Sequence, residues 1–248
     1  MKNKQKHELA VCGLEAVKSL EKNNPQKIKR LYFSSEKAPL FGGLCKKLAS
    51  QKIPYNQVEE KELEKICGSV HHQGIVAMID FPKINSVSKN EISEWKKNSE
   101  HAILLDRIGN ANNFGAIIRS ASFFGIKNII IPQDEKQTSV TTSSYRIAQG
   151  GMEFVNIYTC KSSSKFLRTE KENFVIIGTD LQAKKSVSEL QSICKNKNAL
   201  IVLGNEEKGI SESVRKLCDE LIIIPAKTSM DSLNVAQASS IIFYELTK

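Results

Sequence analysis

The chain has 248 residues, of which 40% are hydrophobic and 25% are charged, and its net charge is +9. This length allows one large domain or two modest ones, and we favour two. The composition is that of a soluble globular protein, and no apolar run reaches the roughly 20 residues needed to span a bilayer. The N-terminal segment lacks the long apolar stretch of a secretory signal, so we expect a cytoplasmic protein with no membrane partner.

The cysteines and histidines show no metal-binding pattern. The six cysteines are scattered, without any Cys-x-x-Cys pair, and the four histidines lack the spacing of a metalloprotease. We therefore expect reduced, mostly structural thiols and no bound metal.

The positive charge is concentrated in the first part of the chain. Residues 1–98 hold 18 Lys and Arg against 11 Asp and Glu, whereas residues 99–248 hold 18 against 16. Such asymmetry favours an N-terminal part that approaches a polyanion such as RNA or DNA. A lysine-rich surface without a partner explains the same charge equally well.

The first part of the chain alternates between helical and strand-like segments. The pattern predicts a helix at about 9–21, a helix in "LCKKLASQ" and a short helix near 60–67, with "KIKRLYFSS", "PYNQVEE" and "GIVAMID" between and after them. The polar segment that Pro82 opens predicts a linker with one helical turn. We expect a small α/β domain over 1–81 and a linker over 82–99.

A second α/β alternation follows, and we expect one domain over 100–248. Its strand-like runs are uniformly apolar, which is typical of a parallel sheet covered by helices on both faces: "AILLD", "NIIIP", "FVNIYTC", "FVIIGTD", "ALIVLGN" and "ELIIIP". In such sheets ligands bind beyond the carboxyl ends of the strands. Three of these ends carry polar signatures that could meet in one pocket: "GTD" at 178–180, "GNEEKGIS" at 204–211 and "IPAKTSMDSLNVAQ" at 224–237.

The segment "NFGAIIRSASFFG" places an arginine in a short apolar helix. Asn113 is suited to cap a helix that begins at Phe114. At 100° per residue, Arg119 lies about 200° from Ile117 and points away from the apolar stripe. A guanidinium offers five fixed donors to a phosphate or carboxylate, and an RNA phosphate would fit. An ordinary capped helix with a solvated arginine is the alternative.

Two strand-end signatures also hold candidate ligand contacts. In "GNEEKGIS", Gly204 lets backbone approach a ligand and Glu206 places a carboxylate at the strand end, although a strand-to-helix turn starting a helix at Ser211 also fits. Ser232 and Asn234 precede the helical "VAQASSIIFYELTK", so either residue caps that helix or bonds a substrate hydroxyl.

The segment His71, His72 and Gln73 allows two interpretations. These residues could contact RNA, but a turn before the strand "GIVAMID" explains them equally well.

Together, "NFGAIIRSASFFG", "IVLGNEEKGIS" and "IPAKTSMDSLNVAQASSIIFYE", in this order, resemble the SpoU family of RNA ribose 2′-O-methyltransferases, within the SPOUT class. The likeness covers about residues 101–248. Residues 7–80, with "VCGLEAV" and "HHQGIVAMI", also look like the small RNA-binding domain of family members that act on large-subunit ribosomal RNA.

The resemblance implies a C-terminal parallel-sheet α/β domain with a deep trefoil knot, S-adenosylmethionine as methyl donor, and an obligate homodimer. The residues that match the family's polar motif positions are Asn113, Arg119, Glu206, Ser232 and Asn234. Donor contacts are implied for Gly204, Ile224 and Leu233, with Thr179 and Leu181 as further contacts. The sequence departs from the family pattern at Glu207, Ala226 and Thr228, which bears on donor affinity and loop geometry.

The predicted activity is therefore methylation of a ribose 2′-hydroxyl in structured RNA, with ribosomal RNA as the first substrate and transfer RNA as the alternative. In the family the counterpart of Arg119 is proposed to activate the hydroxyl. Because a guanidinium does not readily give up a proton, holding the target phosphate and stabilising the developing oxyanion are equally open roles. The competing function is a non-catalytic dimeric RNA-binding protein.

Overall fold

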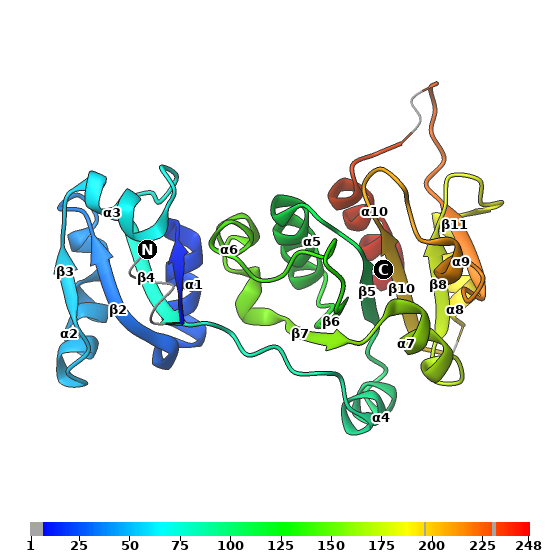
Figure 1. The fold of residues 1–248 in the computed structure, drawn as a ribbon, viewed down its shortest axis with the longest axis horizontal. Helices are drawn as coiled ribbons and strands as arrows, with labels where there is room; N and C mark the ends of the chain where they lie inside the picture. The colour runs from blue at the N-terminus through cyan, green and yellow to red at the C-terminus, as the bar shows by residue number, and fades with distance from the viewer. Residues whose placement is uncertain (1–6, 196, 230–231) are drawn as a thin grey trace. The chain divides into compact units, whose positions relative to one another are not determined.

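The computed structural model describes residues 7–195, 197–229 and 232–248, which form two compact units (Figure 1). Unit 1 comprises residues 1–83 and 140–153, and unit 2 comprises residues 84–139 and 154–248. Each unit has its own sheet and its own core.

Unit 1 is built on a four-stranded sheet of order β1-β4-β2-β3, in which β4 is antiparallel to both neighbours and β3 is parallel to β2. The strands are β1 (Glu8–Cys12), β2 (Ile28–Phe33), β3 (Tyr55–Gln57) and β4 (Ile75–Asp80). The helices are α1 (Leu14–Asn23), α2 (Gly42–Ser50), α3 (Glu60–Cys67) and α6 (Thr142–Ala148), with 3-10 turns at Pro25–Lys27 and Ala38–Phe41. Apolar side chains of β1, α3 and β4 form a shared core. The predicted small α/β arrangement is confirmed.

The helix predicted at about 9–21 is wrong over its first residues. Residues 9–12 lie in β1, where they pair with β4, and the helix begins at Leu14. Gly13 separates the two elements with a φ of 98°, which is accessible to glycine without steric cost. The apolar run "LAVC" fits a buried strand and a buried helical turn equally well, so periodicity alone did not separate them.

Unit 2 is built on a seven-stranded sheet of order β7-β6-β5-β10-β8-β11-β9, in which every recorded pair is parallel. Its strands are β5 (Ala102–Asp106), β6 (Asn128–Pro132), β7 (Asn156–Cys160), β8 (Val175–Thr179), β9 (Lys185–Ser186), β10 (Ala199–Gly204) and β11 (Glu220–Ile223). All residues of β5, β6 and β10 are buried, which confirms the predicted parallel sheet. The two-residue edge strand β9 was not anticipated.

Helices cover both faces of this sheet. They are α4 (Lys89–Lys97), α5 (Ala111–Phe123), α7 (Ser163–Glu170), α8 (Leu190–Cys194), α9 (Glu212–Arg215) and α10 (Val235–Thr247), with a 3-10 turn at Val187–Glu189. A further 3-10 turn, Gly151–Phe154, lies where the chain passes from unit 1 back to unit 2. Helices α4, α7 and α9 pack on one face, against Leu104, Ile176 and Val202. Helix α10 contacts β10 and lies beside α5 and α8 (Figure 1).

Helix α4 is longer than the single turn predicted for the linker. Ser88 and Glu91 form a capping box at its start, and Ile92 and Trp95, three residues apart, are buried in the core of unit 2. The surrounding lysines and glutamates gave this segment a linker-like composition, although its two apolar positions follow helical spacing.

Two structural absences hold for the described residues. In this part of the chain no helix is long and apolar enough to cross a membrane. No group of three or more metal-ligating side chains occurs there either.

Candidate functional site

The predicted site residues follow strands that are neighbours in the sheet of unit 2. Strands β10, β8 and β11 lie side by side and run parallel, so the segments after them leave the sheet at one edge. Strand β5, which precedes α5, pairs with β10 on the other side. The sheet order therefore places all three motifs at the same edge.

At this edge Asn113, Glu206 and Asn234 form a hydrogen-bonded cluster. The Asn113 amide nitrogen donates to Glu206 Oε1 at 2.9 Å, and the Asn234 amide nitrogen donates to Asn113 Oδ1 at 3.1 Å. The other oxygen of Glu206 accepts from Asn205 Nδ2 at 3.2 Å. One residue from each family motif thus enters a single polar chain, and both Glu206 and Asn234 remain exposed.

The capping role predicted for Asn113 is wrong, because α5 begins at Ala111. The cap is Asn110, whose Oδ1 accepts from the backbone nitrogens of Asn112 at 2.8 Å and Asn113 at 3.3 Å. The run "NANN" offers several candidate caps, and sequence alone does not rank them. Because Asn113 is already inside the first turn, its side chain is available to Glu206.

Asn234 caps α10, which is one of the two roles that the sequence left open, and it also joins the polar cluster. Its Oδ1 accepts from Ala236 N at 2.8 Å and caps α10, while its amide nitrogen bonds Asn113. Ser232 is exposed and lies two residues before this cap. Met230 and Asp231, also part of this signature, are outside the described residues.

Residues 204–211 form a tight loop that ends in a helix. Asn205 and Gly209 exchange backbone hydrogen bonds of 3.1 and 2.9 Å, and Ser211 is the N-cap residue of α9, as the strand-to-helix interpretation predicts. A Cβ on Gly204 would lie 2.2 Å from Gly209 C, so the backbone that approaches Gly204 is the chain's own. At Glu207 the backbone is not in the left-handed region, so glycine is not required there.

Arg119 stands apart from the cluster. It is exposed on α5, and within the described residues nothing hydrogen-bonds or pairs with its guanidinium. Arg119 lies six positions after Asn113 in the helix, which places the two side chains about 120° apart around the axis. Of the five residues that match the family's polar motif positions, for which the resemblance implies a catalytic role, a single chain therefore brings three together and leaves Arg119 and Ser232 out of the cluster.

The predicted donor-binding residues surround the same sheet edge with apolar groups. Leu181 and Leu233 are 62% and 42% exposed, and Ile224, directly after β11, is half-buried. Thr179 donates from Oγ1 to Val202 O at 3.4 Å, which ties the end of β8 to β10. Exposed leucines after β8 and before α10 suit a ligand with a flat apolar part, such as an adenosine.

Asp106, at the end of β5, was missed by the sequence interpretation. It is buried, and its carboxylate accepts from Ser163 Oγ at 2.8 Å and Ser211 N at 2.9 Å, so it fixes the loop that carries Glu206. Burial, with the charge of Asp106 as a second cause, raises the pKa of Cys160 to about 12. The available signal was one carboxylate closing the apolar run "AILLD".

The fold and the motifs agree with comparisons to known proteins. Residues 100–244, more than half of the chain, match the SpoU rRNA Methylase family, and residues 10–85 match the domain described as RNA 2′-O ribose methyltransferase substrate binding. Two similar relatives, from Neisseria meningitidis serogroup B and Acinetobacter baylyi, are named 23S rRNA (guanosine-2′-O-)-methyltransferase RlmB. The first is 29% identical, with 95% of this chain and 93% of the relative covered; the second is 28% identical, with 94% of each covered.

Solved structures share the fold across nearly the whole chain. The SpoU methyltransferase AviRb from Streptomyces viridochromogenes, in complex with the cofactor AdoMet, has a TM-score of 0.78 at 22% identity and covers 99% of this chain and 92% of its own. An AdoMet-bound rRNA methyltransferase from Sinorhizobium meliloti has a TM-score of 0.75 at 22% identity, with 98% and 88% covered. The family predicted from the three motifs is confirmed, and the chain belongs to the SpoU rRNA methylase family.

Proposed function

We propose that this protein transfers a methyl group from S-adenosylmethionine to a ribose 2′-hydroxyl of large-subunit ribosomal RNA. The observation that carries the proposal is the Asn113–Glu206–Asn234 cluster, in which three family motifs meet at the ligand-binding edge of a parallel sheet. The names of the relatives, which specify a guanosine of 23S ribosomal RNA, support the choice of substrate.

In this proposal the donor binds at the exposed apolar residues of the sheet edge. Thr179, Leu181, Ile224 and Leu233 would hold it, and it supplies a methyl group on a positively charged sulfur. The Glu206 carboxylate and the Asn113 and Asn234 amides orient the ribose hydroxyl by hydrogen bonds. Arg119 holds the adjacent phosphate and stabilises negative charge that develops on the 2′-oxygen.

The activity is tested with labelled methyl donor and an unmodified transcript of large-subunit ribosomal RNA. We expect label in the RNA and one alkali-resistant position, because a methylated 2′-oxygen cannot attack the neighbouring phosphate. Label in transfer RNA alone would show the substrate class to be wrong. Calorimetry that detects no donor binding, with or without RNA, would favour the non-catalytic RNA-binding protein instead.

We further infer that the protein is a homodimer formed through α5 and α10. Phe123 and Tyr244 are 83% and 55% exposed, and the ring of Phe124 lies edge-on to both, at 5.1 and 6.2 Å. Such an exposed aromatic patch is typical of an interface. Arg119 lies one helical turn before Phe123 on the same face of α5. A second copy seated on Phe123 therefore covers Arg119 as well and can complete its site.

The substitution Phe123→Glu is expected to convert the dimer into a monomer and to reduce methyl transfer, because it places a charge in the aromatic patch. Size-exclusion chromatography with light scattering measures the change. Phe154→Glu is the matched control, since Phe154 is 53% exposed but lies outside α5 and α10. A wild-type monomer, or a dimer unaffected by Phe123→Glu, would contradict this interface.

Three further properties belong to the same proposal. The predicted domains 1–81 and 100–248, joined by 82–99, would act as RNA-binding and methyltransferase domains. The resemblance also implies the trefoil knot near the C-terminus. Ribosomal RNA as substrate implies a cytoplasmic location.

A further inference from the structure

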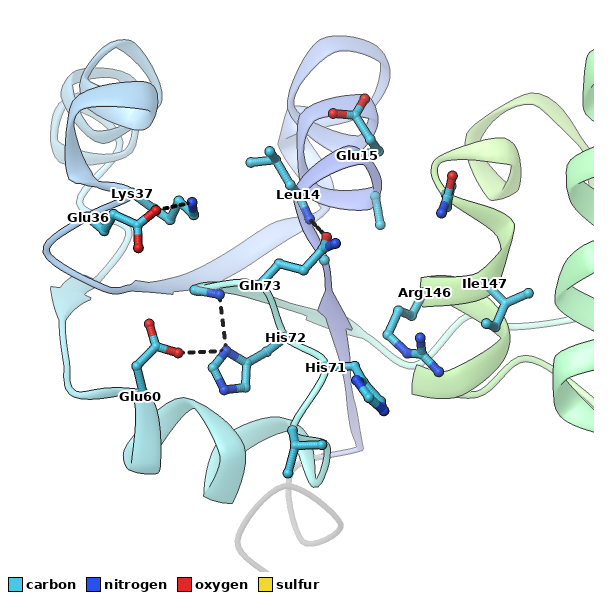
Figure 2. A pocket seen from close by; sticks show the side chains of 15 residues that line it. Leu14, Glu15, Glu36, Lys37, Glu60, His71, His72, Gln73, Arg146 and Ile147 are labelled. Carbon is cyan, nitrogen blue, oxygen red and sulfur yellow. Dashed lines mark hydrogen bonds and ion pairs between the residues drawn. The ribbon is translucent and has the colours of Figure 1, made fainter.

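Unit 1 contains a pocket of about 720 Å³ between the start of α1, the loop before β4, and α6 (Figure 2). Its volume lies within the range of roughly 300–1,000 Å³ that is usual for ligand sites. All of its lining residues belong to unit 1, so it is separate from the Asn113–Glu206–Asn234 cluster. The pocket includes His71, His72 and Gln73, whose role the sequence left open.

The loop before β4 presents Gln73 at this pocket in a fixed conformation. Gln73 has a φ of 54°, in the left-handed region that non-glycine residues rarely adopt. Its Oε1 accepts from Leu14 N at 2.7 Å at the start of α1. Because this bond uses the oxygen, the amide nitrogen is left as a donor, and no group of the described chain accepts from it.

Glu60 supplies a carboxylate oxygen that has no partner within the described chain. His72 is 5% exposed, and its Nδ1 accepts from Gly74 N at 3.1 Å. The same nitrogen lies 3.4 Å from Glu60 Oε2, as Figure 2 shows. The Glu60 side chain is 60% exposed, and no group of the described chain donates to its other oxygen, Oε1. Glu60 thus keeps one acceptor oxygen at the pocket.

Arg146 supplies the opposite charge. Its stem packs on the start of α1, with Cγ 3.6 Å from the position of a Cβ on Gly13. The side chain is half-buried, and its guanidinium has no hydrogen-bond or ion-pair partner within the described residues. The other charged groups of the pocket are paired at short range, Lys37 with Glu36 at 2.6 Å and Glu15 with Lys18 at 3.3 Å.

Among the described residues, the pocket therefore offers one cation without a partner, one carboxylate oxygen without a partner and the amide donor of Gln73, beside the apolar side chains of Leu14, Val70 and Ile147. A groove that only follows a polyanion gains nothing from a carboxylate, because like charges repel. A nucleotide matches the mixture, because its phosphate accepts from a guanidinium and its base has N–H donors on one edge and apolar faces. Guanine, whose N1–H and N2–H donors lie side by side, fits a single carboxylate best.

We propose that this pocket binds one unpaired guanosine nucleotide of the RNA substrate, with Arg146 on its phosphate and Glu60 on the edge of its base. The nucleotide must be unpaired, because in a duplex base pairing covers the donor edge of the guanine and stacking covers both faces of its ring. The inference rests on the proposed function, since it takes RNA as the substrate.

The test measures the affinity of the full-length protein for an unmodified transcript of large-subunit ribosomal RNA at several salt concentrations. Arg146→Ala should weaken binding by about tenfold and lower the salt dependence by roughly one phosphate contact. Arg168→Ala is the control, because Arg168 is likewise unpartnered among the described residues but is exposed and lies on α7 in unit 2. Arg168→Ala should change neither the affinity for the transcript nor its salt dependence. Arg146→Lys should keep most of the affinity that Arg146→Ala loses.

A competition experiment tests the unpaired base. A single-stranded heptamer with one central guanosine should displace the transcript better than the same heptamer in a duplex, and Glu60→Gln should remove that difference. An Arg146→Ala protein that binds RNA like the wild type overturns the proposal. A second result would also overturn it: guanosine 5′-monophosphate binds the wild type but not Arg146→Ala, while the two proteins bind RNA equally well. The pocket would then take a free nucleotide and not a nucleotide of the RNA.

These outcomes are distinguishable from failure of the proposed function. If the wild type binds the transcript but transfers no methyl group, the methyltransferase proposal fails while the affinity comparison still decides the pocket. Donor binding, measured by calorimetry, should be the same in Arg146→Ala and wild type.

Discussion

Replacing Arg119 by alanine is expected to lower methyl transfer by at least about 100-fold, the loss typical of removing a group that stabilises a developing oxyanion. The fold should not change, because the guanidinium is exposed and has no partner in the described part of the chain. Transfer of labelled methyl to the ribosomal RNA transcript measures the activity. Thermal unfolding and donor binding, which should match the wild type, establish that the variant is intact.

Two controls define what Arg119 does. Arg168→Ala removes the same side chain from α7 and should keep full activity. Arg119→Lys retains the charge but not the planar pair of donors, so a positioning role predicts partial activity with an unchanged pH profile. A lysine can give up a proton more readily, so a rate that rises at high pH only in Arg119→Lys would indicate proton removal at this position. Full activity in Arg119→Ala would exclude an essential role.

The sequence predicted the elements whose pattern is unambiguous. Strands β5, β6 and β10 are apolar at every position and appear as the buried centre of the parallel sheet. The prediction stayed ambiguous where one apolar pattern fits both a strand and a helix. The run "LAVC" became β1 because β4 pairs with it, which is a contact between residues more than 60 positions apart. Tertiary pairing of this kind is outside the reach of local periodicity.

The sequence predicted the part of the candidate site that a single chain forms. The convergence of Asn113, Glu206 and Asn234 follows from the order of β5, β10, β8 and β11. The rule for parallel sheets anticipated that the segments of Glu206 and Asn234 could meet, and the family resemblance added Asn113. The cap Asn110 and the buried Asp106 depend on local geometry that the sequence does not rank. Arg119 has no partner among the described residues, so the sequence and this structure leave its contact to the proposed dimer, on the face of α5 that also carries Phe123.

Gly204→Ala is expected to be the most destabilising glycine substitution in the 204–211 loop. The added Cβ would lie 2.2 Å from both Gly209 C and Ile210 N, and 2.6 Å from Gly209 O. These are backbone atoms held by the Asn205–Gly209 hydrogen bonds, so no flexible side chain can yield. Overpacking of this kind costs typically about 1–3 kcal/mol. Because Glu206 follows two residues later, the loop shift should also disrupt its bond to Asn113 and lower methyl transfer.

Alanine substitutions at two other glycines serve as controls, because they add the same methyl group without a clash against backbone atoms. Gly209 has a φ of 64° but open space at its Cβ position, so Gly209→Ala should cost only backbone strain, about 1 kcal/mol. Gly43 is exposed in α2 with nothing near its Cβ position, and Gly43→Ala should leave stability unchanged or raise it by about 0.5–1 kcal/mol. The free energy of unfolding, measured with urea, should therefore be lowest for Gly204→Ala and highest for Gly43→Ala. Equal stability of Gly204→Ala and Gly209→Ala would show that the loop moves freely, in which case Glu206 is not held in place by the packing at Gly204.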